Sequence, residues 1–529
     1  MFKYFLICTL TFFEISFAQN PPTQTGFPVD IPNSNFVRAG STTVIDITGD
    51  NLLEIIVGDS QGQVYAYRSN GTELWRYDTG NAAIESKVAV ADLNLDGNKE
   101  IIISSGSTFT PTELGKVTVL NKDGNLLCSH TPPVFGVATG TGVYASPAIA
   151  NLDSDPELEI VFGDWGAKVS VLNHDCSILW QSQSPPAVIG QQLPSGYNEQ
   201  NPPYTVYVND TIWSSVSIAD MNNDGQLDII IGIDTHIDDN NLTIDGGRIV
   251  VINGNDGTVQ FAIDTDEVIW SSPAIADLDN NGSLDIIVGT GYCWQSAPCA
   301  PPPNGVRPVI NKVYAWNSSG QNLPGWPITL ENNYAVYANS PAIADIDGDG
   351  FLEVVINTFK ENTAPYEGKV FAFEHTGTLK WGTIPKVLAT LDPTSYVYYA
   401  ANSASPIIAD INGDDELDIV VPSNWELIAY DKNGNQFTRS SETTGPQELL
   451  LAGVYPATGT PSIADIDADG DYEIIIASGN AAVSPVPATI YVWDLISSST
   501  NTVPWGSFRN GAKNTGVFTK NLIFQSGFE

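Results

Sequence analysis

Short apolar runs alternate with segments rich in Gly, Asn and Asp along the whole chain. Residues 337–384 show one unit of this pattern: PAIA leads into an acidic loop, LEVVI leaves it, and KVFAFE and LKWGT flank the turn HTGT. Short β-branched and aromatic runs bounded by turn-forming residues are typical of β-strands. Helical periodicity is absent. We therefore predict four antiparallel strands in meander order, which we call A to D.

The acidic loop and its two flanking apolar runs recur eight times. The first positions of the loops are 46 to 69 residues apart, namely Asp46, Asp92, Asn151, Asp220, Asp277, Asp345, Asp410 and Asp465. A repeated unit of this length indicates a repeat architecture. Four-stranded units arranged radially form a β-propeller. We predict an all-β chain folded as an eight-bladed β-propeller, with a seven-bladed ring as the alternative.

The two ends of the chain suggest how the ring closes. The last unit lacks an outer strand after residues 489–494, whereas GFPVDI (26–31) resembles the outer strand GWPITL (325–330). We expect the N-terminal strand to complete the last blade, because closure removes free sheet edges. Residues 19–517 are then one propeller, followed by a C-terminal tail over 518–529.

The first residues have the features of an export signal. Lys3 precedes a short apolar run that ends in Ser16-Phe17-Ala18, which fits cleavage after Ala18. This run is too short to span a bilayer. We expect residues 1–18 to be a signal peptide, with no membrane insertion of the mature chain, and the protein to be secreted, extracellular or periplasmic.

The loop over 345–353 places oxygen ligands at alternate positions. Ca²⁺ takes six to eight oxygen ligands and tolerates irregular geometry. Asp345, Asp347, Asp349 and Glu353 stand at loop positions 1, 3, 5 and 9, and Phe351 at position 7 offers its carbonyl. A glycine near position 6 permits the sharp turn. A bound cation would offset the repulsion among these carboxylates.

The same positions in seven of the loops supply the candidate Ca²⁺ ligands. They are Asp92, Asn94, Asp96 and Glu100; Asn151, Asp153, Asp155 and Glu159; Asp220, Asn222, Asp224 and Asp228; Asp277, Asp279, Asn281 and Asp285; Asp345, Asp347, Asp349 and Glu353; Asp410, Asn412, Asp414 and Asp418; and Asp465, Asp467, Asp469 and Glu473. The alternative is an acidic hairpin turn without a metal. It is strongest for the first loop, where Thr48 replaces an acid, and the third loop also departs from the pattern at Asn151 and Pro156.

The phrase A-D-x-D-x-D-G-x-x-D/E between apolar strands resembles the FG-GAP repeats of integrin α-subunit propellers and their bacterial relatives. The resemblance covers about residues 26 to 494. It implies a closed propeller with calcium in the loops between strands A and B.

The charge of the chain narrows the range of its possible partners. The formal net charge is −40, with 61 acidic residues against 21 Lys and Arg. Nucleic acids and anionic membranes need a basic face, so neither is expected as a partner.

Cys293 and Cys299 are predicted to form a loop disulfide in an oxidising compartment. Cys128 and Cys176 either pair or stay free.

Strand direction places the A–B and C–D loops on one rim and the B–C and D–A loops on the other. Nearly every long insertion falls on the second rim, at 181–211, 233–247, 291–310, 358–368 and 386–402. Long loops on a rigid scaffold often carry function. Four aromatic residues precede strand A on that rim, namely Tyr144, Trp213, Trp270 and Tyr337. They either pack blade against blade or form a surface on which a sugar or peptide stacks.

These observations favour a calcium-binding adhesion or carbohydrate-binding module whose partner is a glycan or a cell-surface protein. The alternative is a polysaccharide-active enzyme such as a rhamnogalacturonan-type lyase. The G-x-S-x-G match over 58–62 leads into the strand-like QVYAY, whereas the hydrolase motif requires a helix there. The four His residues show no zinc-binding spacing. No catalytic residue is therefore assigned.

Overall fold

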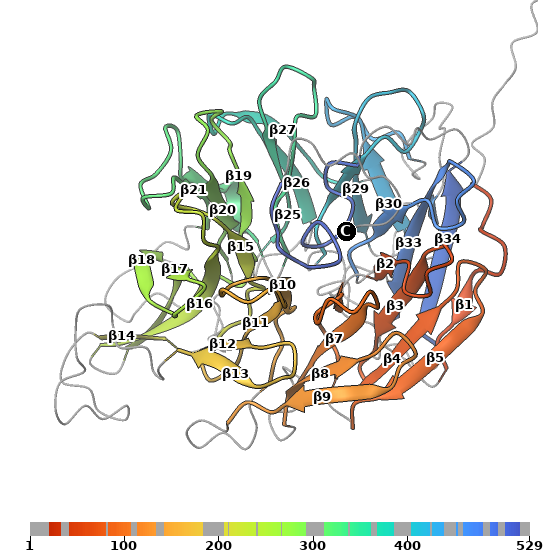
Figure 1. Cartoon of the computed structure of the whole chain (residues 1–529). Helices are drawn as coiled ribbons and strands as arrows, with labels where there is room; N and C mark the ends of the chain where they lie inside the picture. The colour runs from red at the N-terminus through yellow and green to blue at the C-terminus, as the bar shows by residue number, and fades with distance from the viewer. Residues whose placement is uncertain are drawn as a thin grey trace, which may run out of the picture.

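Eight antiparallel β-sheets stand around a common axis in the computed structural model (Figure 1). The eight-bladed prediction is confirmed, and the seven-bladed alternative is wrong. The structure describes residues 21–32, 42–80, 83–106, 114–133, 142–182, 206–209, 211–239, 242–265, 267–291, 311–336, 339–360, 368–385, 404–423, 426–438, 451–452, 459–479, 487–495 and 503–518. In this part of the chain, no helix has the length and apolar character needed to cross a membrane.

Each blade contains four strands in the order A to D. Blades 1 to 4 comprise β2 (Thr43–Ile45), β3 (Glu54–Gly58), β4 (Gln63–Tyr67) and β5 (Glu73–Asp78); β6 (Ala89–Ala91), β7 (Glu100–Ser105), β8 (Lys116–Leu120) and β9 (Leu126–His130); β10 (Ala148–Ala150), β11 (Glu159–Gly163), β12 (Val169–Leu172) and β13 (Ile178–Gln181); and β15 (Ser217–Ala219), β16 (Asp228–Asp239), β17 (Leu242–Asn253) and β18 (Val259–Thr265), with β14 (Val206–Asn209) also paired to β16.

Blades 5 to 8 comprise β19 (Ala274–Ala276), β20 (Asp285–Gly289), β21 (Lys312–Trp316) and β22 (Ile328–Thr329); β24 (Ala342–Ala344), β25 (Glu353–Lys360), β26 (Gly368–Phe373) and β27 (Leu379–Thr383), with β23 (Tyr334–Ala335) also paired to β25; β28 (Ile407–Ala409), β29 (Asp418–Ser423), β30 (Glu426–Tyr430) and β31 (Leu451–Ala452); and β32 (Ser462–Ala464), β33 (Tyr472–Ser478), β34 (Thr489–Leu495) and β1 (Val29–Asp30). A 3₁₀ turn, η1, covers Glu331–Asn333.

Burial falls from the axis outward, which explains the different sequence patterns of the strands. Strand B of blade 1, β3, is buried at every position, whereas strand D, β5, is half-buried or exposed throughout. A continuous apolar run is typical of a strand buried on both faces. The core lies between neighbouring blades: one cluster joins Ile55 of blade 1, Ile101 of blade 2 and Ile475 of blade 8.

The N-terminal strand completes the last blade. Val29 pairs with Ile490 and Asp30 with Thr489, so β1 occupies the outer position beside β34 (Figure 1). Blade 8 is thus assembled from both ends of the chain, which is the ring closure expected from GFPVDI.

A relay of hydroxyl groups links successive blades just before strand A. In each case a backbone N–H of one blade donates to the hydroxyl of the equivalent residue in the next, at 2.7 to 3.0 Å. The donor and acceptor pairs are Lys87 and Ser146, Ser146 and Ser215, Ser215 and Ser272, Ser340 and Ser405, and Ser405 and Thr460. This relay explains the serine that recurs before the phrase PAIA.

Residues 503–518, which we call the central segment, follow the inner edge of the ring (Figure 1). Its carbonyls accept the N–H of the middle residue of strand A in six blades, at 2.9 to 3.1 Å. These donors are Val90, Ile149, Ile218, Ile275, Ile408 and Ile463. An inner edge strand otherwise leaves its backbone groups unpaired. The central segment therefore accepts hydrogen bonds from strand A backbone N–H groups that have no partner within their own blade.

Two fully buried cations anchor the central segment. Arg509 donates to the carbonyl of Val216 at 2.7 Å and to the hydroxyl of Ser340 at 3.1 Å, which lie in blades 4 and 6. Lys87 Nζ donates to the carbonyls of Phe508 and Gly511 at 3.0 and 2.8 Å. Burial and, to a smaller extent, the nearby positive charge of Arg509 lower the pKa of Lys87 to about 7.

A tryptophan clasp joins the outer strands of neighbouring blades. Trp75, Trp180 and Trp381 donate their indole N–H to a carbonyl in the next C–D turn, at 2.6 to 2.9 Å. The turn needs glycine beneath the ring, since a Cβ at Gly124 would lie 2.7 Å from Trp75. That glycine has a φ of 77°, a conformation that side chains other than glycine rarely adopt.

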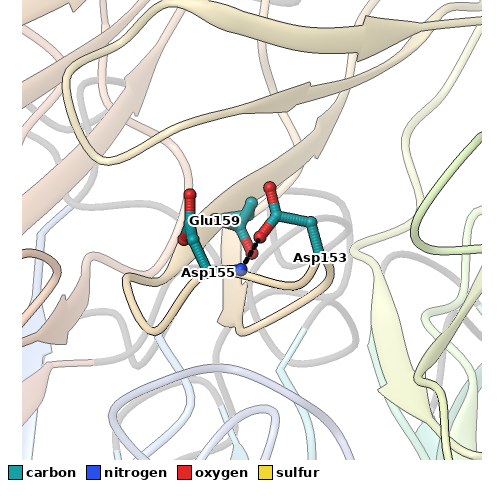
Figure 2. Close-up of side chains that lie close together, drawn as sticks. All are labelled: Asp153, Asp155 and Glu159. Carbon is teal, nitrogen blue, oxygen red and sulfur yellow. Dashed lines mark hydrogen bonds between the residues drawn. The ribbon is translucent and has the colours of Figure 1, made fainter.

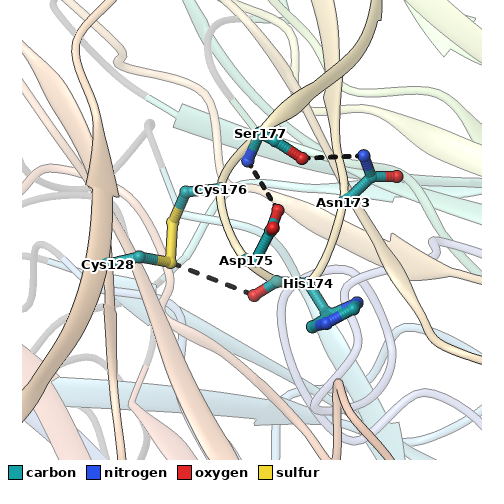
Figure 3. The surroundings of a disulfide bond; sticks show 6 residues. All are labelled: Cys128, Asn173, His174, Asp175, Cys176 and Ser177. Atoms are coloured by element: carbon teal, nitrogen blue, oxygen red, sulfur yellow. Dashed lines mark hydrogen bonds between the residues drawn. A yellow bond between two sulfur atoms is a disulfide. The ribbon is translucent and has the colours of Figure 1, made fainter.

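A disulfide replaces this clasp between blades 2 and 3. In the sheet, Cys128 lies opposite Val119 on the neighbouring strand, just as Trp180 lies opposite Val171, so Cys128 stands at the tryptophan position. Cys176 stands at the glycine position of the next C–D turn, with a φ of 66°. The two residues form the disulfide shown in Figure 3. The structure thus decides the pairing that the sequence left open, whereas Cys293 and Cys299 lie outside the described residues.

We expect the double variant Cys128→Trp, Cys176→Gly to recover stability lost in Cys128→Ser, Cys176→Ser. The 48-residue separation makes the disulfide worth about 4 kcal/mol in the chain-entropy account. The Trp–Gly pair would restore the indole hydrogen bond and relieve the left-handed backbone of residue 176. Thermal melting with and without a thiol reductant measures the effect. If the Trp–Gly variant melts no higher than the Ser–Ser variant, the two devices are not interchangeable.

Candidate metal centres in the A–B loops

A buried acid stands at loop position 9 in all eight blades, at or next to the start of strand B. Each is at most 3% exposed: Glu54, Glu100, Glu159, Asp228, Asp285, Glu353, Asp418 and Glu473. One carboxylate oxygen accepts the backbone N–H of position 2 in the same loop, at 2.6 to 3.1 Å in every blade. The hydrogen bond fixes the acid at the base of the loop.

The other oxygen of this acid lacks a hydrogen-bond partner in three blades. Asp285 Oδ1, Glu353 Oε1 and Glu473 Oε1 are all buried and have no hydrogen-bond partner among the described residues, although Lys380 Nζ lies 3.9 Å from Glu353 Oε1. A buried carboxylate oxygen without a partner is costly. A cation in the loop would remove that cost, so the residues present fit a bound metal ion.

Acidic side chains of four loops converge to within 4.8 Å between their closest oxygens. Positions 1, 3 and 9 meet in blades 5, 6 and 8, whereas positions 3, 5 and 9 meet in blade 3. The four trios are Asp277, Asp279 and Asp285; Asp345, Asp347 and Glu353; Asp465, Asp467 and Glu473; and Asp153, Asp155 and Glu159. Figure 2 shows the blade 3 trio, in which the Asp155 N–H donates to Asp153 Oδ1 at 2.8 Å.

The loop backbone explains the glycine at position 6. In blade 2, Gly97 has a φ of 88° and donates its N–H to Asp92 Oδ2 at 2.8 Å. In blade 3, Pro156 stands at this position and has no N–H to donate. There Asn151 Nδ2 donates to the carbonyl of Asp155 at 2.6 Å instead. The irregular third loop thus has its own local hydrogen bonding.

The first loop also carries the buried acid. Glu54 accepts the N–H of Ile47 at 3.0 Å, and Asp46 accepts those of Gly49 and Asn51 at 2.6 and 2.9 Å. Sequence reasoning did not include Glu54 because Thr48 broke the acidic pattern. The spacing from Asp46 to Glu54 equals that from Asp345 to Glu353, and this signal would have identified it.

Burial raises the pKa of every position-9 acid, and the other loop carboxylates raise it further. The pKa reaches about 6 for Asp228, about 7 for Glu100 and about 9 for Glu473. The position-2 N–H opposes this shift by stabilising the ionised form. Without a metal ion, these acids therefore retain protons well above their ordinary range.

A further acidic trio was not predicted from the sequence. Asp469, Asp471 and Asp494 place oxygens within 4.8 Å of one another, with Asp494 on β34. Asp471 stands at position 7 of the A–B loop of blade 8, where the sequence pattern predicts only a backbone carbonyl ligand, and Asp494 of strand C brings the third carboxylate to this group.

The A–B loops and C–D turns share one rim, as strand direction predicted. Asn255 of a C–D turn donates to Gln226 of an A–B loop at 2.5 Å, and Lys432 pairs with Glu416 at 2.5 Å. The rings of Phe351 and His375 stack across the same gap, with centroids 4.1 Å apart.

Three of the four predicted aromatic residues come together on the opposite side of the blades. The rings of Tyr144 and Trp213 are 5.0 Å apart, those of Trp213 and Trp270 are 4.6 Å apart, and Trp165 joins them. Tyr144, Trp213 and Trp270 are 8%, 9% and 1% exposed. This burial is the arrangement expected for packing between blades 3, 4 and 5. Tyr337 lies outside the described residues, as do most residues of the long insertions.

Residues 46–103, which contain the first two A–B loops, match the FG-GAP-like repeat family. Residues 46–103 thus contain an FG-GAP-like repeat, and the chain folds as an eight-bladed β-propeller. No curated protein matches the sequence.

Solved structures share the fold at low sequence identity. Quinohemoprotein alcohol dehydrogenase ADHIIG from Pseudomonas putida HK5 is 12% identical, with 92% of this chain and 79% of that chain covered and a TM-score of 0.56. The exotype rhamnogalacturonan lyase YesX is 14% identical, with 95% and 82% covered and a TM-score of 0.53. The V. cholerae biofilm matrix protein Bap1 is 14% identical, with 95% and 96% covered and a TM-score of 0.45. For the first two, whose TM-scores exceed 0.5, such identities indicate a common fold only.

Proposed function

We propose that this protein is an exported β-propeller that binds Ca²⁺ in its A–B loops and acts as an adhesion or carbohydrate-binding module. The observation that carries the calcium proposal is the buried acid at position 9 of every blade, which keeps an unsatisfied oxygen in three of them. The loop donors are all oxygens in an irregular arrangement. Ca²⁺ favours such a set, whereas softer metals favour nitrogen or sulfur.

Two features support export. The N-terminal residues 1–18, which lie outside the described part of the chain, have the sequence of a signal peptide. The disulfide between Cys128 and Cys176 is expected to persist in an oxidising compartment.

The binding role is proposed from the difference in loop length between the two rims. The A–B loops and the C–D turns of blades 1 to 4 and 6 are short and are held by local hydrogen bonds, which suits a structural role for ions bound in the A–B loops. The long insertions belong to the opposite rim, where a glycan or cell-surface protein would bind.

The lyase alternative is supported only by a shared fold with YesX, and it can be tested directly. Purified protein in millimolar Ca²⁺ should bind to members of a glycan array. It should release no unsaturated product, followed by ultraviolet absorbance, from pectic and other acidic glycans. Absorbance that rises with time and enzyme concentration would replace the binding module with a lyase.

The calcium proposal predicts the number of bound ions. Asp277→Ala combined with Asp279→Ala should lower the calcium content by one ion per chain, because it removes two donors of the blade 5 trio. Elemental analysis after equilibration in millimolar Ca²⁺ measures this number. Asp123→Ala is a control, since this exposed acid lies in a C–D turn outside the trios. An unchanged calcium content, or no calcium in the native chain, would contradict the proposal.

A further inference from the structure

The A–B loop of blade 6 contains a cation supplied by the protein itself. Lys380 of β27 places its Nζ 2.5 Å from Asp347 Oδ2, 3.0 Å from Glu374 Oε1 and 3.9 Å from Glu353 Oε1. Its side chain is 14% exposed. Asp347 and Glu353 are two members of the metal-binding trio of this loop.

Lys380 occupies a position that can reach the loop in other blades. It precedes Trp381, which pairs with Ala372, as Phe261 pairs with Val251 in blade 4. The residue before Phe261 is Gln260, whose Nε2 donates to the position-9 acid Asp228 at 2.5 Å. The corresponding residues of blades 1, 2 and 3 are Leu74, Leu127 and Leu179. Among these five blades, only blade 6 places a charge there.

The trio of blade 6 otherwise matches that of blade 8 in composition and position. Asp345, Asp347 and Glu353 correspond to Asp465, Asp467 and Glu473, and both position-9 acids are fully buried. Each keeps one oxygen without a hydrogen-bond partner. In blade 8, Asp467 Oδ2 accepts a hydrogen bond from the neutral amide of Gln24 at 2.6 Å, whereas in blade 6 Asp347 Oδ2 contacts the ammonium group of Lys380.

We propose that Lys380 is a built-in counter-ion of the blade 6 loop and makes this loop a weaker calcium site than it would be without the lysine. The inference rests on the proposed binding of calcium by the A–B loops. A calcium ion coordinated by Asp347 and Glu353 would lie within a few ångströms of the ammonium group. The group must then leave its carboxylate partners or repel the ion, and either costs affinity. In the absence of metal, the same ammonium offsets the repulsion among the carboxylates.

Lys380→Met and Lys380→Gln test the competition. Gln is the neutral residue that blade 4 has at this position. Two variants are used so that the test still gives a result if one of them fails to fold. Isothermal titration of the chelator-treated full chain should show one site with about tenfold or greater gain in calcium affinity. The gain should disappear when Asp345→Asn is added, which assigns it to blade 6.

Lys369→Met is the matched control for loss of one positive charge. Lys369 pairs with Glu331 at 2.5 Å and lies outside the A–B loops, so its loss should leave the titration unchanged. In excess chelator, Lys380→Met should melt below Lys369→Met, since three carboxylates lose their counter-ion.

The outcomes separate this inference from the proposed function. If the native chain binds calcium and the Lys380 variants bind it with the same affinity, Lys380 does not compete with calcium. The inference about Lys380 then fails, and the proposal that the A–B loops bind calcium stands. A native chain that binds no calcium would overturn both, and the titration of that chain identifies this case.

Discussion

Removal of divalent cations is expected to lower the melting temperature of the whole propeller steeply, and Ca²⁺ should restore it. Extracellular calcium modules have a Kd of about 10⁻⁴ to 10⁻³ M. At ten times Kd, each independent site stabilises the folded chain by about 1.4 kcal/mol. Eight such loops would contribute up to about 11 kcal/mol, which is comparable to the stability of a whole domain. Differential scanning calorimetry in EGTA and in about 10 mM Ca²⁺ measures the difference.

The pH dependence of stability provides an internal check on this prediction. The position-9 acids have pKa values raised to between about 6 and about 9 in seven blades, so the folded chain without metal holds protons that the unfolded chain releases near pH 4. Their contribution to stability therefore falls as the pH rises from about 4 through these values. Bound calcium favours the ionised acids and should remove this loss at pH 8. Equal melting in EGTA and calcium across this range would refute a structural role for the ions.

Trp213→Ala and Trp270→Ala are each expected to destabilise the protein by about 3 to 5 kcal/mol, the usual cost of truncating a buried aromatic residue. Both indole N–H groups are also used, by Thr211 at 2.9 Å and by Asp234 at 3.2 Å. Because the two rings stack at 4.6 Å, the double variant should cost less than the sum of the single variants.

Melting in saturating calcium measures these effects separately from metal binding. Leu379→Ala is the control, because this side chain is 51% exposed and its truncation should cost little. Near-native melting of both tryptophan variants would contradict the packing role and favour a ligand-binding surface. Their binding to the glycan array should then be measured next.

The number of blades and seven of the eight position-9 acids could be predicted from the sequence because both depend on local pattern. Each loop places its acids within nine residues, and the same hydrogen bond from the acid to position 2 forms in every blade. Even the closure by Val29 and Asp30 was visible, since an outer strand was missing at one end and present at the other. A repeat requires only that each unit be recognised and counted.

Contacts between blades could not be predicted in this way. The pairing of Cys128 with Cys176, the burial of Trp213 and the place of Lys380 among the acids depend on side chains brought together by the ring. The central segment is the extreme case, since Arg509 reaches residues 169 and 293 positions away in the sequence.

The sequence alone determined that each unit is a four-stranded blade with an oxygen-rich loop, because strand alternation, turn residues and loop acids all act over a few residues. The tertiary structure decided which blades are clasped by tryptophan, which pair carries the disulfide, and which acidic loop already holds a positive charge. Those features depend on distances across blade boundaries. The periodic pattern does not encode such distances, because it is the same in every blade.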